Sequence, residues 1–485
     1  MKSIKNSNPK LPHITFTQCH EIIQYLQKEQ TGSISYKDSQ VNEMTFTLNK
    51  VERKKFSLFF ESVDPHLTVG ENDAEKEIKF NLHNAPFNSI SQLYGGRFFI
   101  SNRSMNVSSD SMSATIIASV DRLTNEEHRQ YKTAFHRAVK LIDKPLNLRD
   151  CIQTNNITIL FDNRVSKNSS ISVKLGTNSF DLTSFQVYNS NYLLIESYDK
   201  LQWEDFRDCV YAIMKGYALI SGFLAFEDLY YFSYSTTKKD TIEGFAYYSE
   251  RGDIYSHFPI ITTNPYSKVQ NQSIHDESFN KMKPVSSEIF SELCLKSMAI
   301  SEFETAILTY VEASTATLLL RVQSYFVILE TLANLFKESK KQQKSSLKLK
   351  KKVLRELRKT IQSTDLDGEG KSFFEKKIDN LNQQPNSERL EDVFSHIGIE
   401  LLEEDKEIIK RRNDYLHGRL YKLEDTRENR EENDRDLLYV TMRMCTILAA
   451  LMIKAVGYSG WIINHPKIWE VQTKKFIGEK HFRKI

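Results

Sequence analysis

The sequence contains few cysteines, no excess of charge of one sign and no long hydrophobic run. Its five cysteines are spread over 485 residues, and no two of them have C-x-x-C spacing. That distribution argues against a zinc site and against a disulfide framework. Isolated cysteines of this kind are typical of small buried side chains in a reducing compartment. They are Cys19, Cys151, Cys209, Cys294 and Cys445.

The near balance of charge limits what the chain as a whole can attract. Because the formal net charge is only +3, a nucleic-acid interface has to come from a local basic cluster. The segment Met1–His20 has lysines but no apolar core like that of a secretory signal. The apolar stretch Cys445–Ile453 stops at Lys454 and is too short to span a bilayer. We therefore expect a cytoplasmic protein with no membrane partner, no metal and no cofactor.

Length and periodicity predict an α+β chain of two domains, the first β-rich and mixed. A chain of 485 residues exceeds one ordinary domain, and its 40% hydrophobic share can fill separate cores. Residues 1–263 contain short alternating segments typical of strands. One helix is expected to begin at Thr124, with Glu127 completing a capping box, and another over Trp203–Leu224. The expected strands are Met44–Lys50, Lys55–Ser62, Glu75–His83 and segments near Phe98, Ile116, Ile157, Val173 and Tyr231.

A polar stretch separates this β-rich domain from a second, all-helical one. Residues 264–284 are rich in Ser, Asn and Gln and contain two prolines, which favours a linker. Residues 285–485 lose the strand pattern and gain helical runs. These runs cover Ser286–Ser314, Thr315–Phe336, Leu347–Ile361, Lys371–Leu381, Ser387–His396, Leu401–His417 and Glu428–Val456.

One of these helices ends on the sequence R-N-D-Y-L-H, which places Arg412 five positions before His417. Arginine binds two phosphate oxygens at once, and histidine exchanges protons near neutral pH, so both residues suit RNA cleavage. The spacing alone carries little weight, because arginines precede histidines by similar distances elsewhere in the chain. Those other pairs are Arg122/His128, Arg129/His136, Arg251/His257, Arg389/His396 and Arg411/His417.

The expected helix Leu401–His417 distinguishes Arg412 from the other arginines. At about 100° per residue, its apolar side chains form one stripe roughly 140° wide. Arg412 falls inside this stripe and Arg411 outside it. A charge on a burying face needs a partner or a cavity, because an unpaired buried charge costs several kcal/mol. Asn413, one turn before His417, is placed to orient its ring, and Gly418 to end the helix.

The same residues also allow a structural interpretation. An arginine and a histidine near a helix end are typical of a surface ion pair and of a C-terminal capping residue.

With this context, the motif resembles that of the HEPN superfamily. The sequence R-N-x-x-x-H-G at the end of an amphipathic helix matches the family motif, including the polar residue after the arginine. Upstream, Leu318–Phe336 resembles the second helix of ApeA-like HEPN domains. The long β-rich region in front also resembles the ApeA-like architecture. The resemblance covers Ser286–Ser459 by sequence, and the first domain by architecture only.

The resemblance implies a metal-independent endoribonuclease of bacterial anti-phage defence that acts by abortive infection. It implies an RNA substrate, with tRNA or another structured RNA as candidates, and a phage-encoded trigger. It also implies a homodimer or larger homo-oligomer that forms a composite site, with the N-terminal domain as a sensor or regulator. We assign His417 as general base or acid, Arg412 as phosphate clamp and Asn413 as orienting residue. The expected product is a 2′,3′-cyclic phosphate.

Two further features carry alternatives of their own. Glu330 is the only charged residue between Arg321 and Lys337, so it either fixes Arg412 or forms an ion pair with an interior arginine such as Arg443. The segment Lys337–Lys359 has eleven basic and two acidic residues. It is either a solvated surface or an RNA-backbone contact with strong salt dependence. The lysines proposed for that contact are Lys348, Lys350, Lys351 and Lys352.

Two rival functions remain open at this point. One is a HEPN-like module that binds RNA or protein without catalysis. The other is a HEPN toxin of a toxin–antitoxin pair, whose partner would be a nucleotidyltransferase. The large β-rich domain favours a self-contained sensor and effector over the toxin.

Overall fold

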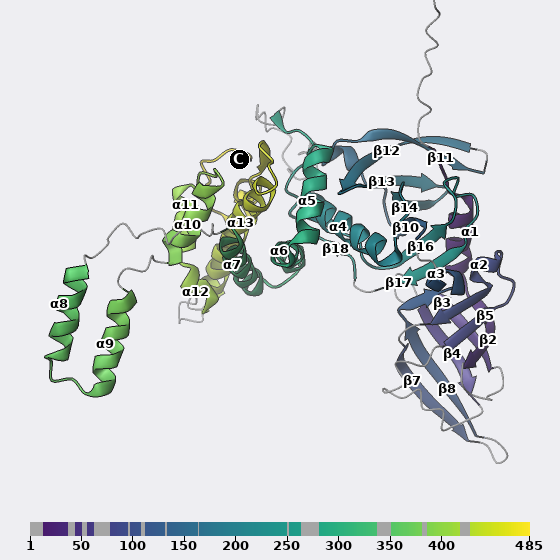
Figure 1. Ribbon diagram of the computed structural model, residues 1–485, viewed down its shortest axis with the longest axis horizontal. Helices are drawn as coiled ribbons and strands as arrows, with labels where there is room; N and C mark the ends of the chain where they lie inside the picture. Colours follow the sequence, from purple (N-terminus) through teal and green to yellow (C-terminus); the bar gives the residue numbers. More distant parts are fainter. Residues whose placement is uncertain are drawn as a thin grey trace, which may run out of the picture. The chain divides into compact units, whose positions relative to one another are not determined.

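The computed structural model divides into two compact units, Met1–Thr315 and Ala316–Ile485. The first is β-rich and mixed, and the second is mostly helical, which confirms the expected two-part α+β organisation (Figure 1). The structure describes residues 13–36, 44–50, 56–62, 78–95, 98–107, 112–130, 133–162, 164–249, 252–262, 281–336, 351–380, 386–417 and 427–485.

One sheet of sixteen strands forms the framework of the first unit. Its order is β1-β11-β12-β13-β14-β10-β16-β17-β9-β6-β5-β2-β3-β4-β8-β7. Only the β1–β11 pair in it is parallel. The strands are β1 His13–Thr15, β2 Gln30–Tyr36, β3 Met44–Lys50, β4 Phe56–Ser62, β5 Ile78–Leu82, β6 Gln92–Gly95, β7 Phe98–Val107, β8 Met112–Val120, β9 Arg122–Thr124, β10 Phe135–Ile142, β11 Asn155–Phe161, β12 Arg164–Leu175, β13 Asn178–Val187, β14 Ser190–Ser197, β16 Leu229–Tyr234 and β17 Gly244–Tyr248.

A strand is therefore present at each expected position, although Lys55 and residues 75–77 lie outside the described residues. The remaining elements of the first unit are helices and one short strand pair. They are α1 Thr17–Leu26, α2 Asn88–Ser91, α3 Glu126–Gln130, the 3₁₀ turn Leu148–Asp150, α4 Trp203–Ser221, α5 Ser287–Ala299, α6 Ser301–Ala313, and the paired strands β15 Phe223–Leu224 and β18 Ile254–Tyr255.

Strand β10 is buried on both faces. Its side chains point alternately into the core that contains α1 and toward α4. Phe135 and Val139 belong to the core that also contains the apolar side of α1. His136 points the other way and stacks on Phe206 of α4, with ring centroids 4.9 Å apart. Although the strand is covered on both sides, three of its eight residues are polar or charged and still buried: His136, Arg137 and Lys140. Each of them therefore needs a partner inside the unit.

A buried ion cluster joins β10 to the neighbouring strand β14 and to β1. Arg137 contacts both carboxylate oxygens of Glu196, at 3.1 and 3.3 Å, and donates to the carbonyl of Thr15. Lys239 lies 2.6 Å from the same carboxylate. Burial disfavours the Glu196 charge, but the two cations hold the pKa of Glu196 below its ordinary value. Two cations thus share one carboxylate, and each of them also donates to a backbone carbonyl, Arg137 to that of Thr15 and Lys239 to that of Ser197.

The helix expected from Thr124 begins at Glu126, and its N-cap is Asn125 rather than Thr124. Thr124 is the last residue of β9, where it pairs with Ala246. The side-chain oxygen of Asn125 accepts the amide of His128 at 2.8 Å, which is the hydrogen bond of an N-cap. The capping box proposed for Thr124 and Glu127 is therefore wrong, because the sheet already holds Thr124.

Helices α5 and α6 belong to the first unit, although the sequence places them with the C-terminal helices. Both pack on α4, and α5 also packs on β12. The expected single helix Ser286–Ser314 is broken at Ile300, whose backbone is extended (φ −132°, ψ 104°). The boundary between compact units falls after Thr315 rather than within residues 264–284, most of which lie outside the described residues.

The second unit is built around one long helix, α13. Its most apolar window, within Asn429–Lys454, is 83% buried, whereas that of α7 is only 39% buried. Both are long and apolar enough to cross a membrane by length and composition, but burial inside the unit makes α13 a core helix. The helices of the unit are α7 Leu318–Leu335, α8 Lys351–Gln362, α9 Gly368–Asn380, α10 Asn386–His396, α11 Glu403–Lys410, α12 Arg412–Leu416, α13 Arg427–Lys454, α14 His465–Ile468 and α15 Glu470–Thr473.

Two features of this unit differ from the all-helical expectation. The short strands β19 (Trp461–Ile463) and β20 (Phe482–Lys484) pair in antiparallel fashion after α13. The expected helix Leu401–His417 is two helices, because Arg411 adopts φ −81° and ψ 6° and interrupts it.

Candidate active site

The predicted site residues Arg412 and Glu330 form an ion pair between α12 and α7. Their side chains are 17% and 27% exposed, so the pair is partly withdrawn from water. Burial lowers the pKa of Arg412 from its ordinary value, although a guanidinium still keeps its charge at any physiological pH. Of the two alternatives for Glu330, the structure therefore shows the pairing with Arg412.

Arg411 and Arg412 are adjacent in sequence but have separate surroundings. The Arg411 side chain is half exposed, lies 3.9 Å from Asp436 and sits over the ring of Tyr415. Tyr415 is buried and stacks on Phe326 of α7 at 5.5 Å between ring centroids. This stacking holds α12 against α7, and it fixes which of the two arginines reaches Glu330.

Asn413 contacts Arg412 rather than the ring of His417. Its side-chain oxygen accepts a hydrogen bond from Arg412 Nη1 at 2.6 Å, and its carbonyl accepts the His417 amide at 3.1 Å. The expectation that Asn413 orients the imidazole is wrong in this conformation. The guanidinium of Arg412 is instead held from two sides, by an amide oxygen and a carboxylate.

His417 is exposed at the end of α12. Among the described residues, its ring has no hydrogen-bond or ion-pair partner. Gly418, which was expected to cap this helix, lies outside the described residues. Helix α12 thus has a paired guanidinium at its first residue and an accessible imidazole directly after its last, which are an anion-binding group and a proton-transfer group.

A second ion cluster, which is buried more deeply, lies at α11, the helix that leads directly into α12. Asp405 of α11 is fully buried; its oxygens lie 3.3 Å from Arg443 and 2.7 Å from Arg483. One of them also accepts the amide of Leu402 at 3.0 Å, which starts α11 at Glu403. Glu479 completes the pairing of Arg443. Burial opposes the charge of Arg443, but these carboxylates raise its pKa above the ordinary value.

Neither Asp405 nor Gln323 was expected from the sequence to contribute to the site. Gln323 lies on α7 and reaches the end of α12. The side-chain amide of Gln323 lies 3.5 Å from the carbonyls of Tyr415 and Leu416. Asp405 follows two glutamates in the sequence, and nothing local distinguishes it from a solvated acid. A helical wheel of α11 is the available signal, since Ile408 and Ile409 follow it on the buried side.

Two of the competing histidines are unsuited to proton transfer near neutral pH. His128 and His136 are both buried in the first unit. Burial lowers the pKa of His128 to about 3 and that of His136 to about 4. His136 is also held by the Ser233 hydroxyl at 2.9 Å and the Leu201 carbonyl at 3.0 Å. Both are core residues of the β-rich unit.

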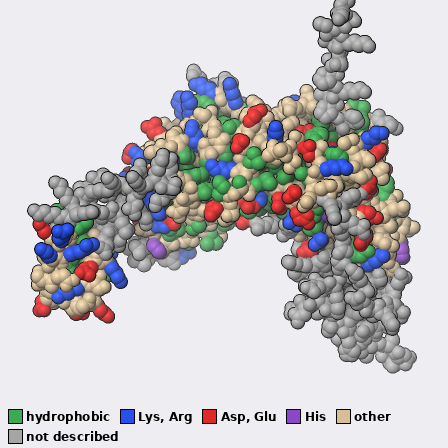
Figure 2. Space-filling view, viewed as in Figure 1, with side chains coloured by type: hydrophobic (Ala, Val, Ile, Leu, Met, Phe, Trp, Pro, Cys, Tyr) green, Lys and Arg blue, Asp and Glu red, His purple; other side chains and the backbone are tan. Residues whose placement is uncertain are grey.

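The basic segment is described only in part. Lys348 and Lys350 lie outside the described residues, and Lys351 and Lys352 are the first residues of α8. Helices α8 and α9 pack on each other as a hairpin, and Figure 2 shows Lys and Arg side chains over its visible face, with acidic ones among them. The RNA-binding role of the four lysines stays a prediction.

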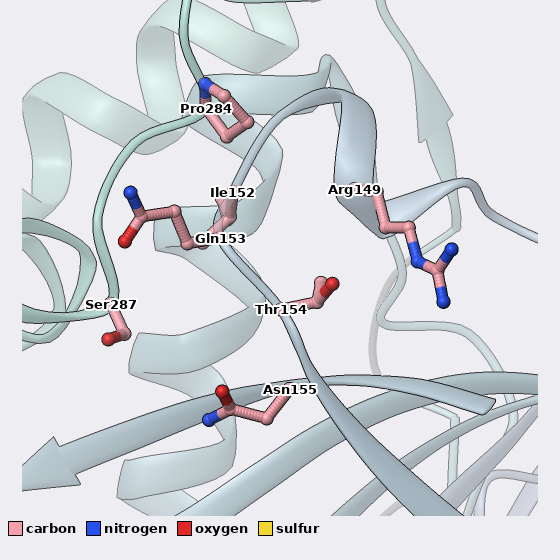
Figure 3. Close-up of a pocket in the computed structure, with 7 residues that line it drawn as sticks. All are labelled: Arg149, Ile152, Gln153, Thr154, Asn155, Pro284 and Ser287. Atoms are coloured by element: carbon pink, nitrogen blue, oxygen red, sulfur yellow. The ribbon is translucent and has the colours of Figure 1, made fainter. Parts of the chain in front are cut away.

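Two hollows are lined by residues of the first unit, and no predicted site residue is among those that line them. One, of about 400 Å³, lies where the chain after the 3₁₀ turn meets the start of α5 (Figure 3). Its groups donate and accept hydrogen bonds but include no acid–base pair. Its lining residues are Arg149, Ile152, Gln153, Thr154, Asn155, Pro284 and Ser287.

The second hollow, of about 620 Å³, is bordered by β12, β13 and α5. In it the Tyr198 hydroxyl donates to Asp181 at 2.6 Å, and burial raises the pKa of Asp181. Tyr198 and the Ser172 hydroxyl thus both donate to this carboxylate. Lys174, Glu288 and Glu292 also line the hollow.

Comparison with known proteins returned no match: no family model, no curated protein and no solved structure is similar to this chain.

Proposed function

We propose that this chain is a metal-independent endoribonuclease of the HEPN type, whose site contains Arg412, Asn413, Glu330 and His417. The observation that carries the proposal is the held guanidinium of Arg412, with Glu330 and Asn413 on it and an accessible imidazole at the end of the same helix. An arginine so oriented has little side-chain entropy left to lose when it binds a phosphate. The anti-phage role and the phage-encoded trigger rest on the sequence resemblance alone.

In the proposed reaction, the ribose 2′-oxygen attacks the adjacent phosphorus and the bond to the 5′-oxygen breaks. A base removes the 2′-hydroxyl proton, and an acid returns a proton to the departing 5′-oxygen, which leaves a 2′,3′-cyclic phosphate and a 5′-hydroxyl. His417 serves as one of these two groups, and Arg412 stabilises the charge on the phosphate oxygens. The second proton-transfer group comes from a second copy of the chain.

The direct test is incubation of the purified full-length chain with total RNA in the presence of EDTA. We expect cleavage to continue, because neither the attack nor the charge stabilisation assigned to these residues uses a metal. Mapping of the ends should find 2′,3′-cyclic phosphates and 5′-hydroxyls. Cleavage that requires Mg²⁺ would contradict the mechanism. RNA binding without any cleavage would instead support the non-catalytic binding module.

An exposed apolar stripe on α7 supports a second copy beside this site. Leu320 and Val327 are 56% and 52% exposed, although both stand on a strongly apolar helix. Two hydroxyl residues lie on the same face. Ser324 donates to the carbonyl of Leu320 at 2.8 Å, and Thr331 donates to the carbonyl of Val327 at 2.9 Å. Their hydrogen bonding is thus satisfied, and another helix can approach closely. The four residues follow 4-3-4 spacing, so they share one face, and Glu330 borders it.

Charge introduced on this stripe is expected to separate the homodimer. In the double variant Leu320→Glu, Val327→Glu, each carboxylate would be buried at the contact, which costs several kcal/mol. Analytical ultracentrifugation should then show monomers where the native chain shows dimers, and RNA cleavage should fall with them. Val471→Glu, also on an exposed apolar residue of this unit, is the matched control and should stay dimeric. A native chain that is monomeric at micromolar concentration would contradict the composite site.

A further inference from the structure

The most exposed large apolar side chain that the structure describes is Phe476, which is 90% exposed. It lies in the connection between α15 and β20. The next residue, Ile477, is buried. A phenylalanine is rarely left in water on an ordered segment beside a buried residue, because burial of its ring is worth about 1.5–3 kcal/mol.

The backbone on both sides of Phe476 is firmly anchored. Lys474 has the left-handed conformation (φ 53°) that ends α15, and the Lys475 amino group lies 2.6 Å from Asp436 of α13. Ile477 donates its amide to Glu470 at 2.6 Å, and its carbonyl accepts from Lys467 at 2.8 Å. The exposed ring is therefore presented on a braced loop and does not extend from a loose tail.

The loop and its neighbours carry three cations, each of which is already paired with a carboxylate: Lys467 with Glu470 at 2.7 Å, and Lys475 and Arg411 with Asp436. The Lys467 ammonium lies 5.5 Å from the centroid of the Phe476 ring. Asp436 contacts Arg411 as well as Lys475, so the loop and the start of α12 meet at one carboxylate. An exposed aromatic ring among cations is the arrangement that single-stranded nucleic acids use, with the base stacked on the ring and the phosphates near the cations.

We propose that Phe476 is a stacking platform for one unpaired base of an RNA strand whose backbone is held by Lys467, Lys475 and Arg411. The surface thus recognises single-stranded RNA segments, since a paired base offers no free face to the ring. A protein partner fits less well, because a docking surface for protein is depleted in lysine at its centre. The assignment of RNA as ligand rests on the proposed function, but its test needs no cleavage.

The test measures binding of a short single-stranded 2′-O-methyl RNA, which cannot be cleaved by 2′-hydroxyl attack, to the full-length chain by fluorescence anisotropy. Phe476→Ala is expected to weaken binding roughly 5- to 150-fold, the effect of losing one stacked base. Phe476→Trp should restore binding, because tryptophan also offers a flat π face. Val471→Ala, which is 75% exposed in the native chain but aliphatic, is the matched control and should bind like the native chain.

Three results would overturn the inference. The first is that Phe476→Ala binds single-stranded RNA with native affinity. The second is that Phe476→Ala loses as much affinity for double-stranded RNA of the same sequence as it does for single-stranded RNA. The third is a change of oligomeric state in Phe476→Ala, which would make the ring a contact between copies of the chain. If binding depends on Phe476 but EDTA-resistant cleavage is absent, the platform stands and the nuclease proposal fails. If cleavage occurs and binding does not depend on Phe476, the nuclease proposal stands and the platform proposal fails.

Discussion

The variant His417→Ala is expected to lose RNA cleavage by a factor of roughly 10² to 10⁴, the usual contribution of a positioned acid or base. His417 is exposed and its ring has no partner among the described residues, so the loss should come without a loss of stability. The measurement is the rate of cleavage in EDTA, with thermal unfolding as the check on folding. Growth arrest on expression should disappear with the activity. Full activity in His417→Ala would exclude the imidazole from the reaction.

Arg412→Ala is expected to reduce cleavage by roughly 10² to 10³, because it removes the cation assigned to the phosphate. It also leaves Glu330 without its ion-pair partner, so Glu330→Gln is the informative companion. Glu330→Gln keeps shape and hydrogen bonding but releases the guanidinium, and it should lower activity less than Arg412→Ala does. Arg411→Ala is the control: that side chain lies on Asp436 and Tyr415, so cleavage of bound RNA should persist.

The second large effect concerns the stability of the unit that carries the site. Asp405→Ala is expected to destabilise the second unit by about 3–5 kcal/mol, because it leaves Arg443 buried with one partner fewer and removes the acceptor of the Leu402 amide at the start of α11. Urea unfolding followed by fluorescence can report on this unit, since Trp461 and Trp469 both belong to it. Destabilisation should also reduce cleavage, because α12 follows α11 directly.

Two comparisons make the Asp405 result specific. Glu403→Ala removes an exposed acid of the same helix that pairs with Lys406, and it should leave the midpoint of urea unfolding nearly unchanged, because an exposed ion pair contributes little to stability. The double change Asp405→Leu, Arg443→Met replaces two buried charges by apolar groups and should recover part of the lost stability. An Asp405→Ala chain as stable as the native one would show that Arg443 and Arg483 do not depend on this carboxylate.

Local patterns were sufficient for most of the secondary structure. The expected strands in the first unit are all present, because residues such as those of Met44–Lys50 alternate between a buried and a solvated face. Helix α4 was also expected nearly to its ends, and its last turn is set by Gly222 in the left-handed conformation (φ 82°). These features depend on neighbours within a few residues, which is what a single sequence contains.

Local patterns failed where a distant residue decides the outcome. Nothing near Arg411 signals a helix break, because the interruption follows from α12 packing its Tyr415 on Phe326 of α7. Thr124 has the sequence of a helix cap, yet its pairing with β17 moves the cap to Asn125. Helices α5 and α6 contain no signal of which core they join. Their assignment to the first unit follows from contacts with α4.

For the site, the sequence by itself determined which residue types are available: an arginine, an amide and a histidine at fixed spacing, and an isolated carboxylate in an apolar helix. Only the tertiary structure decided that Glu330 pairs with Arg412 while Arg443 pairs with Asp405 and Glu479. It also turned Asn413 toward the guanidinium rather than the imidazole. The physical reason is that spacing along a helix fixes only the direction of a side chain. Its partner is fixed by which helix packs opposite, because a buried charge has to be matched there.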